Sequence, residues 1–436
     1  MFVDPNISIA LIGIGVMVVL ILLRLPIAVA MGLVGVAGFT YLSGWDAMLG
    51  LMKTVPYTTA KDYSLSVIPL FVLMGNFALT AGLSKDLYRL GDKLLGHLPG
   101  GLAMATIVAC AGFGAICGSA PATAATMGIV SIPEMRKYNY APSLACGCVA
   151  AGGCLGLLIP PSVGFIIYGI LVGESIGKLF MAGLGAGILL MILYCLVVLF
   201  IAVRNPELAP RGEKATFRER LQALKGVWGV LLLFVLVIGG MMGGFFTATE
   251  GAAVGACGAL LFSLFHRTMT REAFVKALLE TGRTTAMIFA IFIGAYILGY
   301  FLTVTQMPAS LAALITGANI HRYVVIIGIF FVYVFLGCIM DSLAMVLITV
   351  PIFYPSVMAL GFDPIWFGVF IVLVINQGLL TPPVGMNAFV IKGIAKDVPL
   401  STVFRGILPF WVAIFVAVIL VLLFPEIVLF LPRIAS

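Results

Sequence analysis

The sequence predicts an all-helical polytopic membrane protein, built as an inverted repeat with about five spans and one re-entrant hairpin in each half. The first observation is composition: 62% of the 436 residues are hydrophobic and 9% are charged, against about 25% charged residues in soluble domains. The second is an internal repeat, and the third is an uneven distribution of lysine and arginine between alternate loops. Because a soluble fold cannot bury so large an apolar fraction, we expect the lipid bilayer to be the solvent.

Ten apolar segments are each predicted to cross the membrane as a helix. The segments 7–23 and 407–430 show the pattern, since each approaches or exceeds the roughly 20 apolar residues needed to cross about 30 Å of hydrocarbon. The first segment has no basic residues before it and no cleavage site after it, so we expect an anchor rather than a signal peptide. The predicted spans are 7–23, 25–43, 64–82, 142–175, 181–203, 227–246, 249–265, 287–303, 365–394 and 407–430.

Two further apolar segments, 99–133 and 323–357, are predicted to be re-entrant hairpins. Each is interrupted near its middle by residues that break a helix, at 118–121 and 337–341. Two full spans in place of each hairpin would put a turn with few or no charges at the membrane surface. We therefore expect the chain to turn back inside the membrane at both breaks.

The internal repeat relates the two halves of the chain. The run Gly-Leu-Leu-Ile-Pro-Pro at 156–161 recurs as Gly-Leu-Leu-Thr-Pro-Pro at 378–383, which is 222 residues later. Upstream the offset is 219, as between Gly75 and Gly294. An odd number of spans in each half turns the second copy upside down, which makes the repeat inverted. The predicted organisation is a first repeat at 1–203, a connector at 204–226 and a second repeat at 227–436.

The basic residues give the predicted orientation. With the N-terminus outside the cell membrane, 19 of the 24 lysines and arginines fall in inner loops and 5 in outer ones. Lysine and arginine collect on the cytoplasmic side of membrane proteins, and one mistaken span would have scrambled the distribution. The sequence therefore predicts an N-terminus on the outer side of the membrane and a connector on the cytoplasmic side.

Segments 83–98 and 271–283 combine polar residues with apolar ones at helical spacing, so they are predicted to be amphipathic helices at the membrane surface. We interpret them as matched arms of the two halves, each linking a moving part of the protein to a fixed part. This interpretation depends on the symmetry of the repeat alone.

Four interruptions of predicted membrane helices indicate a binding site near the middle of the bilayer, because paired broken helices in inverted repeats are typical of secondary transporters. They are the two hairpin tips and the Pro-Pro pairs at 160–161 and 382–383. Prolines lack an N–H group, so carbonyl oxygens there lose helical donors and are available to a hard cation such as Na⁺. Hydroxyl groups that could complete two symmetry-related ion sites belong to Ser119, Thr123, Thr126, Thr349 and Thr381. The alternative is that the prolines kink packing helices and the nearby glycines only allow close helix contact.

Asp341 is the one carboxylate deep within an apolar segment, and a buried charge in a membrane is costly enough to predict a function. It could contact the substrate, an ion or a proton, or it could only cap the following helix. Asn387 and Gln377 flank the second Pro-Pro pair and are predicted to line the same cavity. Glu250 follows Thr247 at the start of a span, where capping of the helix explains it fully.

Other classes of function find little support in the sequence. Nucleic-acid binding is not expected, since the net charge of +7 is explained by cytoplasmic loops. The eight cysteines lie in apolar segments without the spacing of disulfides or zinc ligands. No HExxH pair, GxSxG turn or P-loop is present, so neither an intramembrane enzyme nor direct use of ATP is expected.

Three motifs resemble the large membrane subunit of TRAP (tripartite ATP-independent periplasmic) transporters. They are the run from Gly244 to Gly255 with its Thr-Ala-Thr-Glu-Gly-Ala-Ala core, the hairpin tip Gly118 to Thr123, and both Pro-Pro elements. The resemblance extends over essentially the whole chain. It implies a sodium-coupled elevator-type transporter of the bacterial inner membrane, with a small four-span membrane subunit and a periplasmic substrate-binding protein as partners. The substrate would be an organic acid such as a C4-dicarboxylate or sialic acid.

The resemblance also implies which residues bind sodium and substrate. Cys117 stands where we expect a serine, so a backbone carbonyl would replace that hydroxyl in the first ion site. The residues implied for the two sodium sites are Cys117, Ser119, Gly156, Leu157 and Pro160 in the first, and Gly337, Cys338, Gly378, Leu379 and Thr381 in the second. The residues implied for the substrate are Asp341, Ser119, Thr123, Gly164 and Asn387. A related but stand-alone ion-coupled carboxylate symporter, without partner subunits, is the alternative.

Overall fold

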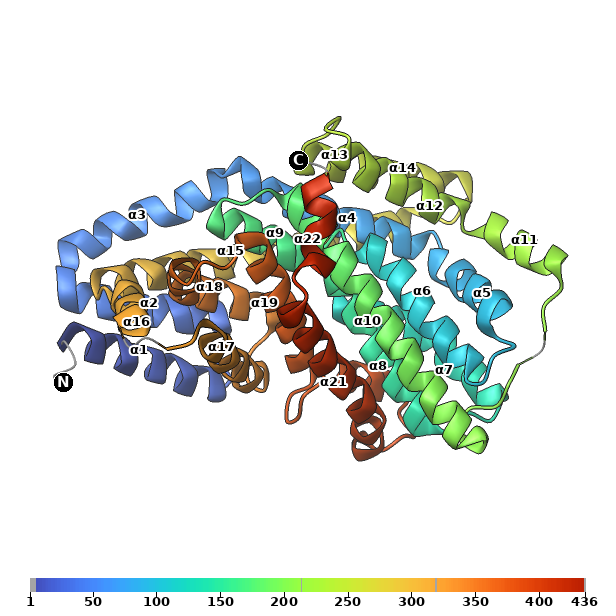
Figure 1. Cartoon of the computed structure of the whole chain (residues 1–436). Coiled ribbons are helices and arrows are strands. Elements are labelled where there is room, and N and C mark those ends of the chain that lie inside the picture. Colours follow the sequence, from blue (N-terminus) through green and yellow to red (C-terminus); the bar gives the residue numbers. More distant parts are fainter. Residues whose placement is uncertain (1–4, 213, 318–319, 435–436) are drawn as a thin grey trace.

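The computed structural model of the chain describes residues 5–212, 214–317 and 320–434, and within these ranges it contains helices and no strands (Figure 1). The ends of the two predicted halves (1–4 and 435–436) and Glu213 of the predicted connector lie outside the described residues. The helices are α1 (Pro5–Leu22), α2 (Ile27–Ser43), α3 (Trp45–Lys61), η1 (Tyr63–Ser66), α4 (Val67–Thr80), α5 (Leu83–Leu95), α6 (Gly101–Cys117), α7 (Ala120–Lys137), α8 (Pro142–Leu158), α9 (Val163–Val172), α10 (Ile176–Arg204), η2 (Pro206–Leu208), α11 (Phe217–Gly226), α12 (Trp228–Phe234), the π-helical turn η3 (Val235–Gly239), α13 (Gly240–Met242), α14 (Ala248–Phe265), α15 (Arg271–Val304), α16 (Met307–Gly317), α17 (Arg322–Gly337), α18 (Ser342–Ala359), α19 (Pro364–Gly378), α20 (Met386–Ile394), α21 (Leu400–Leu423) and α22 (Glu426–Ile434).

The described part of the chain has seven helices long and apolar enough to cross a membrane, and an eighth if the bent pair α11 and α12–α13 counts as one span. Six of them overlap the predicted spans 64–82, 142–175, 181–203, 249–265, 287–303 and 407–430. The bent pair overlaps 227–246, and the other three predicted spans fall on shorter apolar helices. The seventh helix, α18, was predicted as one arm of a hairpin. The protein is therefore a multi-pass, all-helical membrane protein.

The last predicted span, 407–430, had the wrong boundaries. Helix α21 begins at Leu400 and ends at Leu423, and a separate short helix, α22, follows. Pro425 explains the end, because proline restricts the residue before it and cannot continue the hydrogen-bond ladder.

Both hairpin segments contain two helices separated by a short break. Helix α6 ends at Cys117 and α7 begins at Ala120, while α17 ends at Gly337 and α18 begins at Ser342. The breaks coincide with the predicted ones. Gly118 terminates α6 in the left-handed region, with φ of 64°, which is a conformation that favours glycine.

The predicted matching of segments 83–98 and 271–283 as equivalent arms is corrected by the helix boundaries. Segment 271–283 is the first part of α15, which continues without a break to Val304. At the repeat offset of 219 residues, α15 corresponds to α3 and α4 of the first half, which η1 separates. Helix α5 corresponds instead to α16. The spacing of polar and apolar residues identified two amphipathic segments, but it did not identify which segment of the other half is equivalent to each of them. The inverted orientation of the halves stays a prediction.

Side-chain caps fix several helix starts. Thr247 and Glu250 form a reciprocal capping box at the start of α14, as predicted for Glu250. Asp341 caps α18 and Asp363 caps α19, each through backbone N–H groups of the first turn. These caps satisfy amide groups that have no partner within the helix.

Glycines let the helices pack closely in two groups. Helix α2 crosses α15 where Gly35 meets the backbone of Ile297 and Leu298, and where Gly294 meets the backbone of Ala28. In the other group, α8 and α19 are buried almost all round, as expected of central helices. In Figure 1, α1, α2, α3 and α16 lie at one end of the molecule and α5, α7 and α11 at the other.

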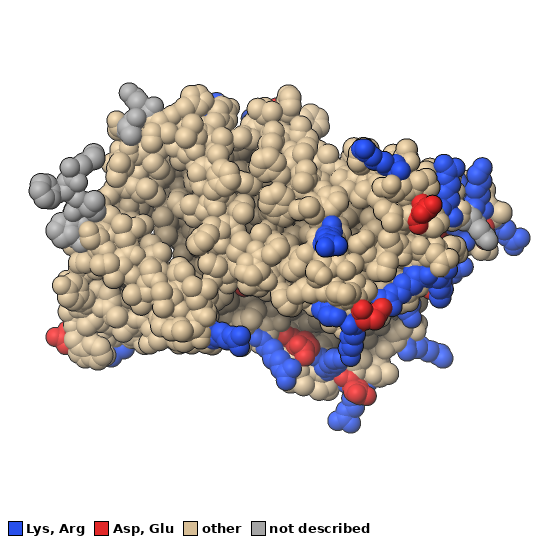
Figure 2. Space-filling model, turned by 90° about the horizontal axis from the view of Figure 1, so that it is seen from below, with Lys and Arg blue, Asp and Glu red and all other residues tan. Residues whose placement is uncertain are grey.

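Basic side chains gather at one end of the molecule. Figure 2 shows that the lysines and arginines of the face turned to the viewer concentrate towards the end that carries α5 and α11 in Figure 1. That end includes α11 of the connector, which was predicted to lie on the cytoplasmic side. The distribution agrees with the predicted orientation, which stays a prediction.

Candidate ion and substrate site

A cavity of about 830 Å³ lies between the two hairpin tips and the helices α2, α4 and α15. The first hairpin contributes 117–122 and the second contributes 341–343. The polar side chains that line it are Asn76, Ser119, Thr284, Asp341 and Ser342. No lysine or arginine is among its described lining residues. A concave, mainly apolar space with a few convergent polar groups is the usual form of a small-molecule site.

Asp341 both lines this cavity and caps α18. Its Oδ2 accepts a hydrogen bond from the N–H of Leu343 at 3.1 Å. The capping role considered from the sequence is therefore confirmed, and a role in binding substrate, ion or proton stays a prediction. The cap holds the carboxylate at the edge of the cavity, so its charge faces the space in which a ligand would lie.

Ser119 holds the equivalent position before α7, but its side chain makes no capping hydrogen bond. Pro121 follows in the first turn of α7 and has no N–H group. The amide groups at this helix start are therefore not satisfied by a side-chain cap, and the segment that carries them lines the cavity. An uncapped helix N-terminus carries a partial positive charge that favours an anion.

The first predicted sodium site is assembled where the tip of the first hairpin meets the break after α8. The Cα atom of Gly156 lies 2.6 Å from a Cβ placed on Gly114, and a Cβ on Gly156 would lie 2.8 Å from the carbonyl oxygen of Ser119. Cys117 and Leu157 both line the cavity beside this contact. Only glycine permits such an approach of two backbones.

Several oxygen atoms converge at this first break. The residues four positions after Gly156 and Leu157 are Pro160 and Pro161, which have no N–H to donate to their carbonyls. Ser162 donates its hydroxyl to the carbonyl of Leu157. The hydroxyl of Thr123 is fully buried, has no oxygen or nitrogen hydrogen-bond partner, and lies near the thiol of Cys117 and against the position of a Cβ placed on Gly156. A buried polar atom without a partner is costly, so a cation or water at this position would relieve it.

The second predicted sodium site, like the first, lies where two glycines bring the backbones of two helices into close contact. Gly337 at the end of α17 meets Gly378 at the end of α19, where a Cβ on either residue would lie within 2.6 Å of the other's Cα. Thr381 Oγ1 donates to the carbonyl of Gln377 at 2.6 Å and accepts from Trp411 Nε1 at 2.9 Å. Cys338 donates its thiol to the carbonyl of Val334.

The carbonyls of this second break are partly satisfied. Gly378 accepts from the N–H of Thr381 at 3.2 Å, and Leu379 accepts from the N–H of Asn387 at 3.2 Å. A carbonyl oxygen has two lone pairs, so one hydrogen bond leaves room for a cation. The donors gathered at both breaks are carbonyl and hydroxyl oxygens, which are the ligands that hard cations take. The residues present therefore fit Na⁺.

Three residues predicted to bind the substrate do not line the cavity. Thr123 is buried beside Gly156, and Gly164 lies in α9 against Leu157. Asn387 is fully buried, and its side chain donates to the carbonyl of Ala150 in α8 at 2.9 Å. Their role in substrate binding stays a prediction.

Sequence reasoning missed two cavity residues, Asn76 in α4 and Thr284 in α15. Asn76 donates to the hydroxyl of Thr281 at 2.9 Å and so ties α4 to α15. The available signal was an amide within the apolar segment 64–82, since polar groups inside a membrane are costly. Asn76 lies in a predicted unbroken span, away from the four interruptions that predicted the site.

The arrangement defines a class of protein: a multi-pass membrane protein in which two broken hairpins and two broken helices enclose a central cavity, as in secondary transporters. The sequence matches the family described as "Tripartite ATP-independent periplasmic transporter, DctM component" over residues 14–427. This chain belongs to that family, the large permease subunits of TRAP transporters.

Relatives with known names resemble most of the chain. It is 38% identical to the C4-dicarboxylate TRAP transporter large permease protein DctM of Pseudomonas aeruginosa, over 86% of this chain and 88% of that protein. It is 36% identical to the sialic acid TRAP transporter large permease protein SiaM of Vibrio cholerae, over 85% and 87%. It is 34% identical to the isethionate TRAP transporter permease protein DctMQ of Oleidesulfovibrio alaskensis, over 90% of this chain and 62% of that protein.

A solved structure shares the fold. The crystal structure of the Alcanivorax borkumensis YdaH transporter has a TM-score of 0.61, with 14% sequence identity over 86% of this chain and 88% of the other. At this identity the likeness concerns the fold alone. The relatives are named as permeases, and this chain is accordingly a transporter subunit and not an enzyme.

Proposed function

We propose that this chain imports a small organic acid across the bacterial inner membrane, coupled to sodium and fed by a periplasmic substrate-binding protein. The observation that carries the proposal is the cavity enclosed by both hairpin tips, with the uncapped start of α7 on its wall. The names of the relatives support an organic acid, since they include C4-dicarboxylate and sialic acid.

The cavity wall supports recognition of an anion that arrives together with a cation. The described lining has no lysine or arginine, and it contains the carboxylate of Asp341. A substrate carboxylate would be stabilised by the helix start at Ser119 and by nearby bound cations rather than by a fixed positive side chain. We therefore expect organic-acid binding to depend on sodium, which is the requirement for coupled transport.

Two sodium sites are proposed at the two breaks. The first would use oxygens of Ser119, Gly156 and Leu157, with the buried hydroxyl of Thr123 next to them. The second would use the carbonyls and hydroxyl of 378–381 where they meet Gly337. Sodium supplies positive charge at the hairpin tips when it is bound. The protein residues hold the hairpin tips against the broken helices and exclude water from the contact.

We propose an elevator-type movement in which the hairpins, α8 and α19 shift as one body against α2, α4 and α15. The position of the cavity on the boundary between these two groups supports this division. The predicted orientation, with a periplasmic N-terminus, would let a binding protein reach the outer face. The DctMQ relative, of which this chain covers 62%, leaves enough additional chain to accommodate a small four-span subunit.

The test is uptake of a panel of organic acids into proteoliposomes that contain this chain and its small-subunit partner. Uptake is measured with and without an inward sodium gradient and with and without the binding protein. We expect uptake to need both. Uptake by this chain alone, indifferent to the binding protein, would replace the proposal with a stand-alone ion-coupled symporter.

A further inference from the structure

The connector between the two halves is fastened by its backbone to the base of the first hairpin. Gly212 donates its N–H to the carbonyl of Gly96 at 2.9 Å, and Gly100 donates to the carbonyl of Ala209 at 3.3 Å. A third bond joins a residue beyond the hairpin to the connector, from the N–H of Ala141 to the carbonyl of Leu208 at 3.0 Å. Because these bonds involve both the entry and the exit of the hairpin, the connector cannot shift relative to its base without breaking them.

Tyr140 reinforces this contact from its side chain. Its hydroxyl donates to the carbonyl of Pro210 at 2.8 Å and accepts from the N–H of Leu102 at 3.3 Å. The ring is buried, with 3% of its surface exposed. One side chain therefore joins the connector to the first turn of α6.

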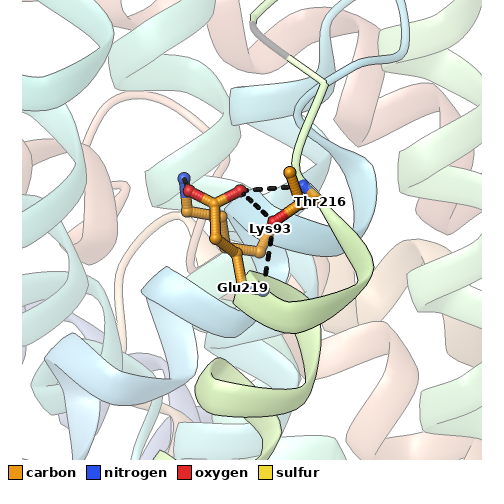
Figure 3. A network of polar contacts seen from close by, with 3 residues as sticks. All are labelled: Lys93, Thr216 and Glu219. Atoms are coloured by element: carbon orange, nitrogen blue, oxygen red, sulfur yellow. Dashed lines mark hydrogen bonds and ion pairs between the residues drawn. The ribbon is translucent and has the colours of Figure 1, made fainter.

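Helix α11, in the second part of the connector, lies alongside α5 in antiparallel direction. Near one end Lys93 of α5 faces Glu219 of α11, with 3.7 Å between the charged atoms. Near the other end Gly226 lies 3.7 Å, measured from a placed Cβ, from the side chain of Asp86. Figure 3 shows Lys93 beside Glu219, whose carboxylate also accepts from the N–H and the hydroxyl of Thr216 at 2.8 and 2.9 Å. The carboxylate of Glu219 thus belongs to the N-terminal cap of α11 and also forms an ion pair with α5.

Helix α5 in turn packs along the first arm of the hairpin. A Cβ on Gly91 would lie 2.8 Å from the carbonyl of Ala105, so the two helices touch backbone to backbone. Leu87 fills the space over Gly112 in the same way. The close packing leaves α5 no freedom to swing independently of the hairpin.

The start of α5 and the end of α11 lie next to each other, and at this point both helices join the rest of the protein. Helix α5 starts after Gly82, which has φ of 75° and ψ of 13° and has nothing within 4 Å of a placed Cβ. Helix α11 ends at Gly226 and the chain bends by 50° into α12. The helix before Gly82, α4, packs on α14 and α15, and both α4 and α15 belong to the fixed group in the proposed movement.

We propose that α5 and α11 form one rigid arm together with the first hairpin. The arm pivots at Gly82, before α5, and at the Gly226–Val227 joint, after α11. The inference rests on the elevator movement of the proposed function and assigns its cytoplasmic pivot. A predicted consequence is that residues 96–100, although rich in glycine, are not the hinge, because the connector holds them in place.

The first experiment compares Gly82→Ala with Gly173→Ala. Gly173 is a matched control, since it has φ of 74° and ψ of 22° and also has open space around a placed Cβ. Both changes place alanine in the left-handed region, at a cost of about 1 kcal/mol or a fivefold change in equilibrium. We expect Gly82→Ala to slow uptake at least about fivefold and Gly173→Ala to leave it near the wild-type rate. Equal effects of the two changes would overturn the assignment of the pivot.

The second experiment joins α5 to α11 covalently through Lys93→Cys and Glu219→Cys with a disulfide-containing bifunctional thiol reagent that spans the space left by the two long side chains, and exposed Cys257 is replaced by serine. If the two helices move as one, the cross-link leaves uptake within about twofold of the reduced protein. Loss of uptake that a reducing agent restores would show that the helices slide past each other and would refute the arm.

A third measurement separates failure of the arm from failure of the proposed function. Spin labels on α5 and α11 should keep one narrow distance distribution with and without sodium, whatever the uptake assay shows. A distance that changes with sodium overturns the arm even if transport is sodium-coupled. Absence of uptake from the wild-type protein counts against the proposed function, while the label distance still decides about the arm.

Discussion

The contact between Gly337 and Gly378 allows a quantitative prediction for the second proposed ion site. A Cβ added at Gly378 would lie 2.6 Å from the Cα of Gly337 and 3.3 Å from its carbonyl carbon. Carbon atoms in ordinary contact lie about 3.5–4.0 Å apart, so Gly378→Ala must push the two helix ends apart by about 1 Å. Both neighbouring atoms belong to the backbone, and no flexible side chain can absorb this displacement.

The expected cost of such overpacking is about 1–3 kcal/mol. If this cost falls on the state with bound sodium, the apparent sodium affinity drops by about 5- to 150-fold, since 1.4 kcal/mol corresponds to a factor of ten. The assay is the sodium concentration that gives half-maximal uptake in proteoliposomes, measured together with thermal unfolding of the purified protein. We expect a large rise in the first quantity.

Gly393→Ala in α20 is the matched control, because Gly393 has nothing within 4 Å of a placed Cβ. Alanine there should keep sodium dependence and slightly raise the stability of the helix, by about 0.5–1 kcal/mol. An unchanged half-maximal sodium concentration in a folded Gly378→Ala protein would show that the contact between these helix ends does not shape an ion site.

Three further predictions follow from named side chains. Asp341→Asn should abolish transport with normal expression, because asparagine still caps α18 but removes the charge facing the cavity. Uptake measures the first effect, and the amount of protein in the membrane measures the second. Asn387→Leu should change stability by less than about 1.5 kcal/mol and leave the KM for substrate unchanged, because a lost hydrogen bond is offset by removal of the unpartnered Oδ1. Hydrogen bonds from Thr216, and the nearby charge of Lys93, hold the pKa of Glu219 below its usual range. The ionised carboxylate therefore stabilises the folded connector at neutral pH, and this stabilisation is lost as the pH falls through the lowered pKa. The protection of amides 214–226 against hydrogen exchange, corrected for the intrinsic pH dependence of exchange, should therefore fall in acid in the wild type and show no such step in Glu219→Gln.

Each of these has a result that contradicts it. Near-normal uptake by Asp341→Asn would reduce Asp341 to a helix cap. A tenfold rise in KM for Asn387→Leu, with Ser356→Ala as the control for loss of a buried polar group, would return Asn387 to the substrate site. An equal acid response of the wild type and Glu219→Gln would assign the titration to another carboxylate.

The sequence by itself determined the membrane environment, the two broken hairpins and the two Pro-Pro breaks. These features depend on local properties: apolar length, the missing N–H of proline and the conformational freedom of glycine. Asp341 could be selected for the same reason, since a carboxylate in an apolar segment is costly wherever the chain places it. Glu250 could be assigned as a cap because capping involves residues only three positions apart.

Only the tertiary structure decided which of these residues meet. Asn387 has a polar side chain beside a break, which made a role in substrate binding reasonable, but its amide is directed to the backbone of α8 and not into the cavity. Asn76 lines the cavity from α4, which no spacing in the sequence indicates. The fastening of the connector to Gly96 and Gly100 depends on backbone hydrogen bonds between segments more than 100 residues apart. Backbone donors and acceptors are the same at every residue except proline, so a sequence does not encode such a contact until packing brings the segments together.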